Sequence, residues 1–324
     1  MSVFNLGNAI MGSGILGLAY AMANTGVVLF LVLLTVVAVL SSYSIHILLK
    51  LSGIVGIRAY EQLGYRAFGT PGKMAAGIAI TLQNIGAMSS YLYIVKYEFP
   101  LVIQAFLKLD KPAGEWYMNG NYLVIIVSIA VILPLTAYTI PILAFAFVCH
   151  PEVLPIYTEL RNPTKKKMQH VANISIAVMY CMYFLAALFG YLTFYGEVEA
   201  ELLHTYSRID PYDTLILCVR VAVLIAVTLT VPIVLFPVRR AIQQMIFPNK
   251  TFNWPRHIAI AFVLLTFINM LVIFAPNILG IFGVIGATSA PCLIFIFPAV
   301  FYIRIVPKEE EPMTSFPKVM VSIS

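Results

Sequence analysis

Apolar segments long enough to cross a lipid bilayer recur along almost the whole chain. A helix needs about 20 apolar residues to span the hydrocarbon core. The chain has 324 residues, of which 61% are hydrophobic and 10% charged, whereas soluble domains carry about 25% charged residues. This composition predicts an all-α membrane protein and excludes soluble classes. The predicted spans are residues 3–22, 26–49, 74–97, 121–136, 138–158, 170–194, 213–238, 258–276 and 280–303.

The charges between the spans predict a topology. Basic residues dominate segments 50–73, 159–170 and 239–257, which the positive-inside rule places in the cytoplasm. Segments 98–120 and 195–213 carry more acidic residues and are predicted to lie outside. The net charge of +6 therefore indicates how the chain is oriented in the membrane. We expect the lipid bilayer to be a partner and do not expect binding to nucleic acid.

One stretch conflicts with this topology. If segment 50–73 is inside, span 138–158 should end outside, yet it ends at the most basic loop of the chain. The connection at 135–137 is also too short for an ordinary loop. Either the hydrophobic stretch 121–158 crosses the membrane once in an unusual way, or an odd number of spans is missing between Pro134 and Tyr138. We expect the second, a chain shortened at this point. The segment 316–324 likewise leaves no room for a further span.

The first span contains residues that disfavour a helix. Gly12 and Gly14 flank Ser13, and Asn8 lies one turn earlier. Each glycine costs a helix interior about 1 kcal/mol relative to alanine. Irregular backbone at membrane depth is tolerated where it is buried in protein or lines a cavity, as in the broken helices of transporters. The alternative is that these small residues only allow close helix packing.

Span 138–158 is also interrupted. Pro151 and Pro155 follow Phe147 and His150, and each proline removes a backbone donor. A pair of interrupted spans favours a transporter. His150 is an ionisable group at membrane depth, which allows a proton-linked role. The alternative is that His150 only hydrogen-bonds a carbonyl freed by Pro151.

Two further spans contain polar side chains. The hydroxyl of Thr228 or Thr230 could join backbone carbonyls around a hard cation such as Na⁺. The alternative is a hydrogen bond to the carbonyl four residues earlier. In span 74–97, Asn84, with Gln83 and Ser89 nearby, could face a site or join helices by hydrogen bonds.

The sequence has no signature of an enzyme or of a bound transition metal. It lacks the His-Glu-x-x-His, Gly-x-Ser-x-Gly and phosphate-loop patterns. The four cysteines do not have the spacing of a zinc site. A membrane enzyme is therefore not expected.

Several motifs resemble the sodium-coupled neutral amino acid transporters. They are SVFNLGNAIMGSGILGLAY (2–20), QNIGAMSSY (83–91), FVCHPEVLPIY (147–157) and FGYLTFY (189–195). Three others resemble the system N branch of that family: GIRAYEQLG (56–64), VLFPVRR (234–240) and APNILGIFG (275–283).

The resemblance implies a fold of two inverted five-helix repeats plus one helix. The first repeat would occupy 1–136 and the second 137–303 of a single transporter domain, followed by a cytoplasmic tail at 304–324. Sodium would be held by Asn8 and Thr228. The substrate would be bound by Gly12, Ser13, Gly14, Asn84 and Phe147, and His150 would be the proton-linked candidate.

The resemblance also implies a function: transport of glutamine, histidine and asparagine with Na⁺ in exchange for H⁺ at the plasma membrane. The sequence departs from the family where the fifth helix should follow residue 135, and the eleventh helix is also absent. The alternative to an active transporter is therefore a truncated form that does not transport.

Overall fold

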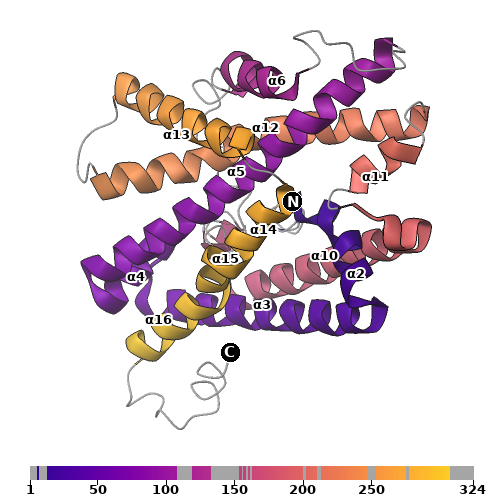
Figure 1. Cartoon of the computed structure of the whole chain (residues 1–324). Helices are drawn as coiled ribbons and strands as arrows, with labels where there is room; N and C mark the ends of the chain where they lie inside the picture. Colours follow the sequence, from indigo (N-terminus) through magenta and orange to yellow (C-terminus); the bar gives the residue numbers. More distant parts are fainter. Residues whose placement is uncertain are drawn as a thin grey trace.

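The computed structural model describes a bundle of crossing helices (Figure 1). The described residues are 6, 13–107, 119–132, 153–154, 156–157, 160, 163–199, 202–209, 213–246, 253–274 and 277–306, and they contain helices but no strand. Six helical segments in this part are long and apolar enough to span a membrane, which confirms six of the predicted spans. They are Val27–Val55, Thr70–Leu107, Lys165–Glu197, Thr214–Pro232, Trp254–Phe274 and Gly280–Ile305.

The first predicted span is not one regular helix. Its described part opens with a 3-10 turn, η1 (Ser13–Gly17), and continues as the short helix α2 (Leu18–Thr25). Gly26, at φ 75°, then turns the chain into α3 (Val27–Val55). A left-handed backbone is accessible to glycine at little cost, so Gly26 separates α2 from the first full-length span.

Helices α4 (Tyr60–Phe68) and α5 (Thr70–Leu107) follow. Segment 50–73, which we predicted only as a cytoplasmic loop, therefore contains a helix. The expectation that an outer loop begins at residue 98 is wrong, because α5 continues for ten more residues. Pro100 lies inside α5 and provides no N–H for the carbonyl of Lys96.

The predicted span 121–136 is helical over its described part. It consists of α6 (Gly120–Val127) and the π-helical turn η3 (Ser128–Ile132), and Asn119 caps it by accepting a hydrogen bond from Asn121 N at 3.0 Å. The predicted span 138–158 lies mostly outside the described residues. Within it, Val153, Leu154, Ile156 and Tyr157 are buried in the core.

Four helices and a short 3-10 turn follow in the sequence. They are α10 (Lys165–Phe194), η4 (Tyr195–Glu197), α11 (Leu202–Ile209), α12 (Thr214–Ile246) and α13 (Trp254–Phe274). The α10 and α12 ends have the side-chain caps expected at helix N-termini: Thr164 accepts from Lys167 N, and Asp213 accepts from Leu215 N. α12 packs against α5, and α10 packs against α2 and α3.

The last span is divided into four pieces: α14 (Ile278–Ala287), α15 (Ser289–Pro291), the π-helical turn η5 (Cys292–Ile296) and α16 (Phe297–Ile305). A π turn leaves carbonyls without their usual helical donors. Two other helices supply those donors: Tyr60 of α4 donates to Leu293 O at 2.7 Å, and Ser44 of α3 donates to Ile294 O.

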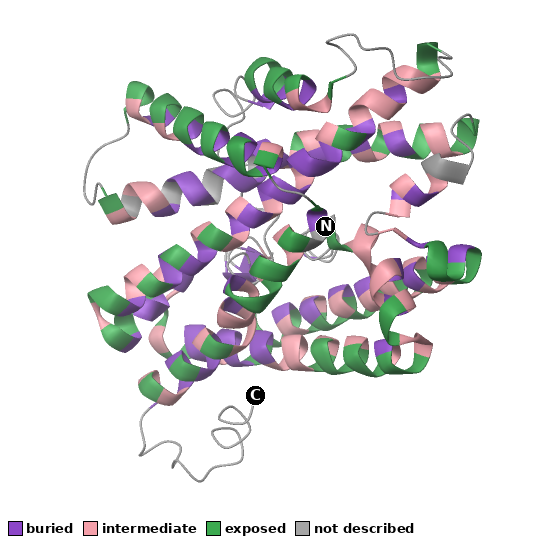
Figure 2. Ribbon diagram, in the orientation of Figure 1, coloured by how far each residue is buried: buried purple, intermediate pink, exposed green. Residues whose placement is uncertain are grey.

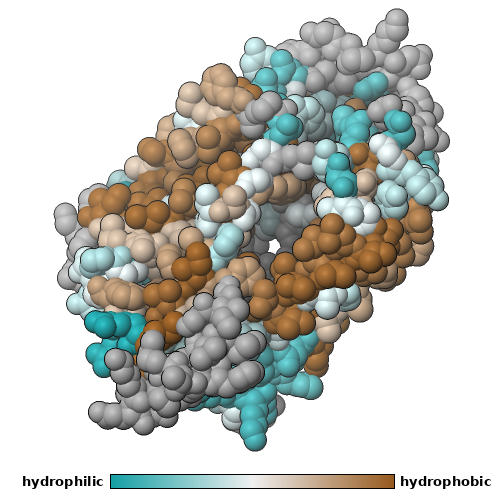
Figure 3. Space-filling view, turned by 60° about the horizontal axis from the view of Figure 1, so that its bottom comes forward, coloured by the Kyte–Doolittle hydropathy of each residue, from teal (hydrophilic) through white to brown (hydrophobic). Residues whose placement is uncertain are grey.

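Two large clusters of buried apolar residues form the core. The first core cluster joins α3, α4 and α16, whereas the second joins α5, α12 and α13. Large apolar side chains also lie exposed along the outer helices, where Figure 2 shows long green stretches. The space-filling view shows broad hydrophobic faces with hydrophilic groups gathered mainly toward the ends (Figure 3). This distribution fits a protein whose outer surface faces lipid tails.

Candidate functional site

The 3-10 turn at the start of α2 lies among several spans. η1 contacts α5, α10 and α11, and Leu16 within it packs against the second core cluster. Figure 1 shows this part of the chain near the centre of the bundle, beside the N-terminus. The turn thus lies against three other helices, while its described residues Gly14 to Gly17 are exposed or half-buried.

Gly14 in this turn is not needed for close packing. A Cβ atom added to Gly14 would meet no described atom within 4 Å, and Gly14 is not among the described glycines with positive φ. By contrast, a Cβ on Gly190 of α10 would lie 2.7 Å from Ala19 Cβ, so packing does explain that glycine. The space beside Gly14 therefore weakens the interpretation that its small size serves only helix contact.

Thr228 lies in the middle of α12 at the edge of its buried stripe. It is half-buried, and Leu224, Val227 and Val231 beside it belong to the second core cluster. Leu16 of η1 packs against the same cluster. The interrupted first segment and this stretch of α12 thus border the same core cluster, which also contains residues of α5 and α13.

The Thr228 hydroxyl differs from those of most threonines inside the described helices. The structure records no hydrogen bond between it and another described residue. Six helical threonines donate to the carbonyl four residues earlier, at 2.7 to 2.9 Å: Thr25, Thr35, Thr81, Thr193, Thr230 and Thr266. The local alternative predicted for both threonines of α12 is thus observed for Thr230 but not for Thr228.

The backbone at Thr228 adds a second oxygen. Pro232 stands four residues later in α12, at the position whose N–H would normally donate to the Thr228 carbonyl. Because proline has no N–H, this carbonyl has lost its regular helical donor. Thr228 therefore offers two oxygens of the kind that hard cations prefer.

Asn84 is buried on α5 and is satisfied within its own helix. Its Nδ2 donates to Ile80 O at 2.8 Å, so the structure records no link from Asn84 to another helix within the described part. The interhelical contact comes from its neighbour: Ser289 Oγ donates to Gln83 Oε1 at 2.9 Å. This bond joins α5 to the last span just after Thr288, where the backbone leaves the helical conformation (φ −120°, ψ −83°).

Several predicted site residues lie outside the described residues. Asn8, Gly12, Phe147 and His150 belong to this group, so their predicted roles stay predictions. Ser13 is described through its backbone, as the first residue of η1.

Sequence reasoning missed a buried ion pair. Glu98 of α5 has no exposed surface, Arg220 of α12 is 2% exposed, and Arg220 Nε lies 3.5 Å from Glu98 Oε2. Neither oxygen of Glu98 accepts a hydrogen bond. Ionisable residues in membrane spans mark functional sites or paired charges. The available signal was the single arginine inside the apolar part of span 213–238.

Helix α11 covers this ion pair. Arg220 Nη2 donates to Leu203 O at 3.5 Å, and His204, the next residue, forms a short contact with Glu199 through Nδ1. α11 also contacts η1. The ion pair therefore lies under the segment that connects α10 to α12, next to the interrupted first segment.

Known proteins resemble this chain over nearly its whole length. The profile of the family described as "Transmembrane amino acid transporter protein" matches residues 1–139 and 136–323. The "Sodium-coupled neutral amino acid symporter 2" of Danio rerio is 49% identical, over 95% of this chain and 76% of the relative. The "Sodium-coupled neutral amino acid transporter 4" of Pongo abelii is 46% identical, over 95% of this chain and 78% of the relative. The chain is therefore a multi-pass membrane transporter rather than an enzyme, and it belongs to the transmembrane amino acid transporter family, among the sodium-coupled neutral amino acid transporters.

Proposed function

We propose that this chain moves neutral amino acids of the glutamine, histidine and asparagine type across the plasma membrane, driven by Na⁺ and with H⁺ moving in the opposite direction. Sodium-coupled transport of neutral amino acids is supported by the names of both relatives. The substrate type and the proton exchange rest on the system N motifs in the sequence.

Thr228 carries the sodium part of the proposal. Its hydroxyl has no recorded partner among the described residues, and Pro232 removes the donor of its carbonyl. An oxygen pair left without donors costs free energy unless a ligand satisfies it. A sodium ion bound here, with Asn8 from the first segment as a further ligand, would provide that compensation. The backbone amides around Ser13 and Gly14 would then face the substrate carboxylate, as helix N-termini do for anions.

The proposed mechanism rests on the interrupted first segment and on α12. Sodium stabilises the state in which the first segment and α12 lie together, and the amino acid binds beside the break at Gly14. Relative movement of the two repeats then opens the opposite side of the membrane. Asn84 and Phe147 would contribute to the substrate pocket, and His150 would exchange the proton.

A threonine pair within one helix provides the test. Uptake of radiolabelled glutamine is measured in cells with Na⁺ or choline for wild type, Thr228→Ala and the matched control Thr230→Ala. We expect Thr228→Ala to raise the half-saturating Na⁺ concentration about tenfold or more, since hydrogen bonds and contacts to charged groups contribute about 1.5–3 kcal/mol. Thr230→Ala, whose hydroxyl is bonded to Ala226 O, should stay close to wild type. Equal effects of the two substitutions would contradict the assignment of Thr228.

The alternative is a form of such a transporter that does not transport. The two family matches meet at residues 136–139, where the topology predicts missing residues. The alignment with the Danio rerio relative spans 383 positions, whereas 95% of 324 residues is about 308, so about 75 positions have no counterpart here. Surface expression of the wild type without sodium-dependent uptake would favour this alternative and leave the family unchanged.

A further inference from the structure

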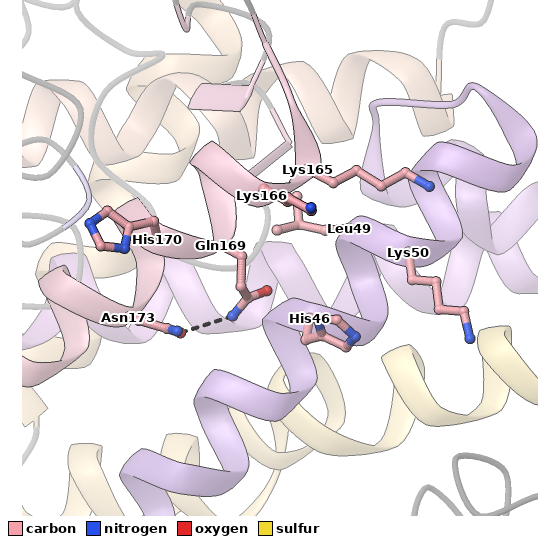
Figure 4. Close-up of a pocket in the computed structure, with 8 residues that line it drawn as sticks. All are labelled: His46, Leu49, Lys50, Lys165, Lys166, Gln169, His170 and Asn173. Atoms are coloured by element: carbon pink, nitrogen blue, oxygen red, sulfur yellow. Dashed lines mark hydrogen bonds between the residues drawn. The ribbon is translucent and has the colours of Figure 1, made fainter.

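A pocket of about 350 Å³ lies between α3 and α10 (Figure 4). α3 contributes His46, Leu49 and Lys50 to its lining. α10 contributes Lys165, Lys166, Gln169, His170 and Asn173. Three lysines and two histidines thus line the pocket, and no carboxylate is among its described lining residues. Such a lining attracts an anion.

The packing of the two helices fixes this geometry. A Cβ on Gly53 of α3 would overlap the side chain of Lys165, so the start of α10 lies directly against the end of α3. Lys50 is held by Tyr302 of α16, because its Nζ donates to the Tyr302 hydroxyl at 2.6 Å. Lys165 and Lys166 form no ion pair with a described carboxylate. They are therefore the charges available to a ligand.

Two further features of the pocket indicate which chemical groups a ligand would carry. The pocket lies at the N-terminus of α10, a helix of 30 residues, whose dipole favours negative charge. Gln169 Nε2 donates to Asn173 Oδ1 at 2.9 Å, and its Oε1 is buried without a hydrogen-bond donor. In a ligand that carries both phosphate and hydroxyl groups, the phosphate would pair with the lysines. A hydroxyl group would donate a hydrogen bond to Gln169 Oε1.

An apolar path leads away from the pocket along α10. Ile174 directly follows the lining residue Asn173, and Val178, Met182 and Leu185 continue along the same helix at intervals of three or four residues. All four side chains are exposed. Phosphate groups in the pocket could thus belong to a lipid whose acyl chains lie on this path.

We propose that the pocket between α3 and α10 binds the phosphorylated polyol headgroup of an anionic membrane lipid. The basic loops predict that this end of the bundle faces the cytoplasm, where anionic lipids attract basic segments. Basic pockets between membrane helices on that side bind such headgroups. None of this pocket's described lining residues is among those predicted to bind sodium or substrate, so the proposal does not depend on transport activity.

The test uses the purified full chain in neutral detergent. Binding of a short-chain phosphatidylinositol bisphosphate is titrated by thermophoresis for wild type, for Lys165→Gln/Lys166→Gln and for the control Arg66→Gln/Lys73→Gln. The control removes two positive charges from the predicted cytoplasmic side but from outside the pocket. Phosphatidylcholine and free inositol phosphate form two further arms of the experiment.

We expect wild type and the control to bind the phosphoinositide with similar affinity. The pocket variant should bind about 25-fold more weakly, at about fivefold for each lysine removed. Phosphatidylcholine should not compete, and free inositol phosphate should bind more weakly than the lipid because it lacks acyl chains. Equal losses in both double variants would overturn the proposal, since they would indicate only diffuse surface charge. Equal affinity for free inositol phosphate would overturn the assignment to a lipid, and absence of phosphoinositide binding to wild type would overturn the site.

Discussion

Replacing Arg220 with methionine removes the cation that faces a fully buried carboxylate. Arg220 Nε and Glu98 Oε2 are 3.5 Å apart, which corresponds to about 5 kcal/mol of Coulomb attraction at an effective dielectric constant of about 20. Much of that attraction offsets the cost of taking both charges out of water. Breaking a buried pair from one side typically costs about 3–5 kcal/mol, because the remaining charge stays buried without compensation. We expect Arg220→Met and Glu98→Gln each to destabilise the protein by this amount.

The double variant separates the ion pair from the rest of the packing. Glu98→Gln/Arg220→Met leaves no buried charge, and replacing a buried ion pair by residues of similar volume is often nearly neutral. The double variant should therefore be more stable than either single variant. The free energies of unfolding of wild type, the two single variants and the double variant form a double-mutant cycle. They are measured by denaturant titration of the purified protein in mixed micelles. Glu197→Gln, which changes an exposed carboxylate, serves as the control. If the double variant is as unstable as the sum of the two singles, the two side chains do not stabilise each other.

Three further substitutions have defined outcomes. Gly64→Ala should destabilise the protein by about 1–3 kcal/mol, because a Cβ at Gly64 of α4 would lie 2.5 Å from the carbonyl oxygen of Gly72 in α5 and backbone cannot easily move. Gly283→Ala, where a Cβ would meet no described atom within 4 Å, should be neutral or stabilising in the same unfolding assay. Burial, with a smaller contribution from Cys292, raises the pKa of Tyr60 well above its usual 10.0. Since the unfolded chain releases this proton first, the stability that Tyr60 provides is complete below about pH 10 and is lost as the pH rises toward the folded pKa. Tyr60→Phe should therefore be about 1–3 kcal/mol less stable than wild type at neutral pH, because the Leu293 carbonyl loses its donor, and the difference should shrink at alkaline pH. A difference that stays constant across this pH range would contradict the argument.

The helical bundle could be predicted because span length and apolar composition depend on the sequence alone. Six of the nine predicted spans are confirmed as spanning helices, although their ends differ. The ends were less predictable because α5 continues through polar residues, which its contacts with α12 bury. Helix α4 escaped prediction because it has only nine residues and mixed polarity.

The candidate site could be predicted only in part. The Gly-Ser-Gly interruption and the threonines of α12 were visible, since glycine and polar side chains are unusual in apolar spans. The choice between Thr228 and Thr230 could not be predicted, because it depends on which of the two hydroxyls donates to a carbonyl of the same helix. The partner of Arg220 could not be found either, since Glu98 lies 122 positions away in the sequence and meets it only when α5 and α12 pack together.

The division of the last span has a mechanical consequence. Its second half is fastened to the helices around it, because α3 and α4 donate to two carbonyls of η5 and Lys50 holds Tyr302 in α16. Its first half, α14, ends at the non-helical Thr288 and is exposed along most of its described length. Next to Thr288, the Ser289 hydroxyl donates to Gln83 of α5, and this is the one side-chain hydrogen bond between the described residues of the two helices at this point. The second half is thus held by hydrogen bonds, whereas α14 is held on α5 mainly by apolar packing, with Ile285 directly against Gly86. A change of angle at Thr288 would therefore have to break apolar contacts and the bond between Ser289 and Gln83, but not the bonds of η5 to α3 and α4.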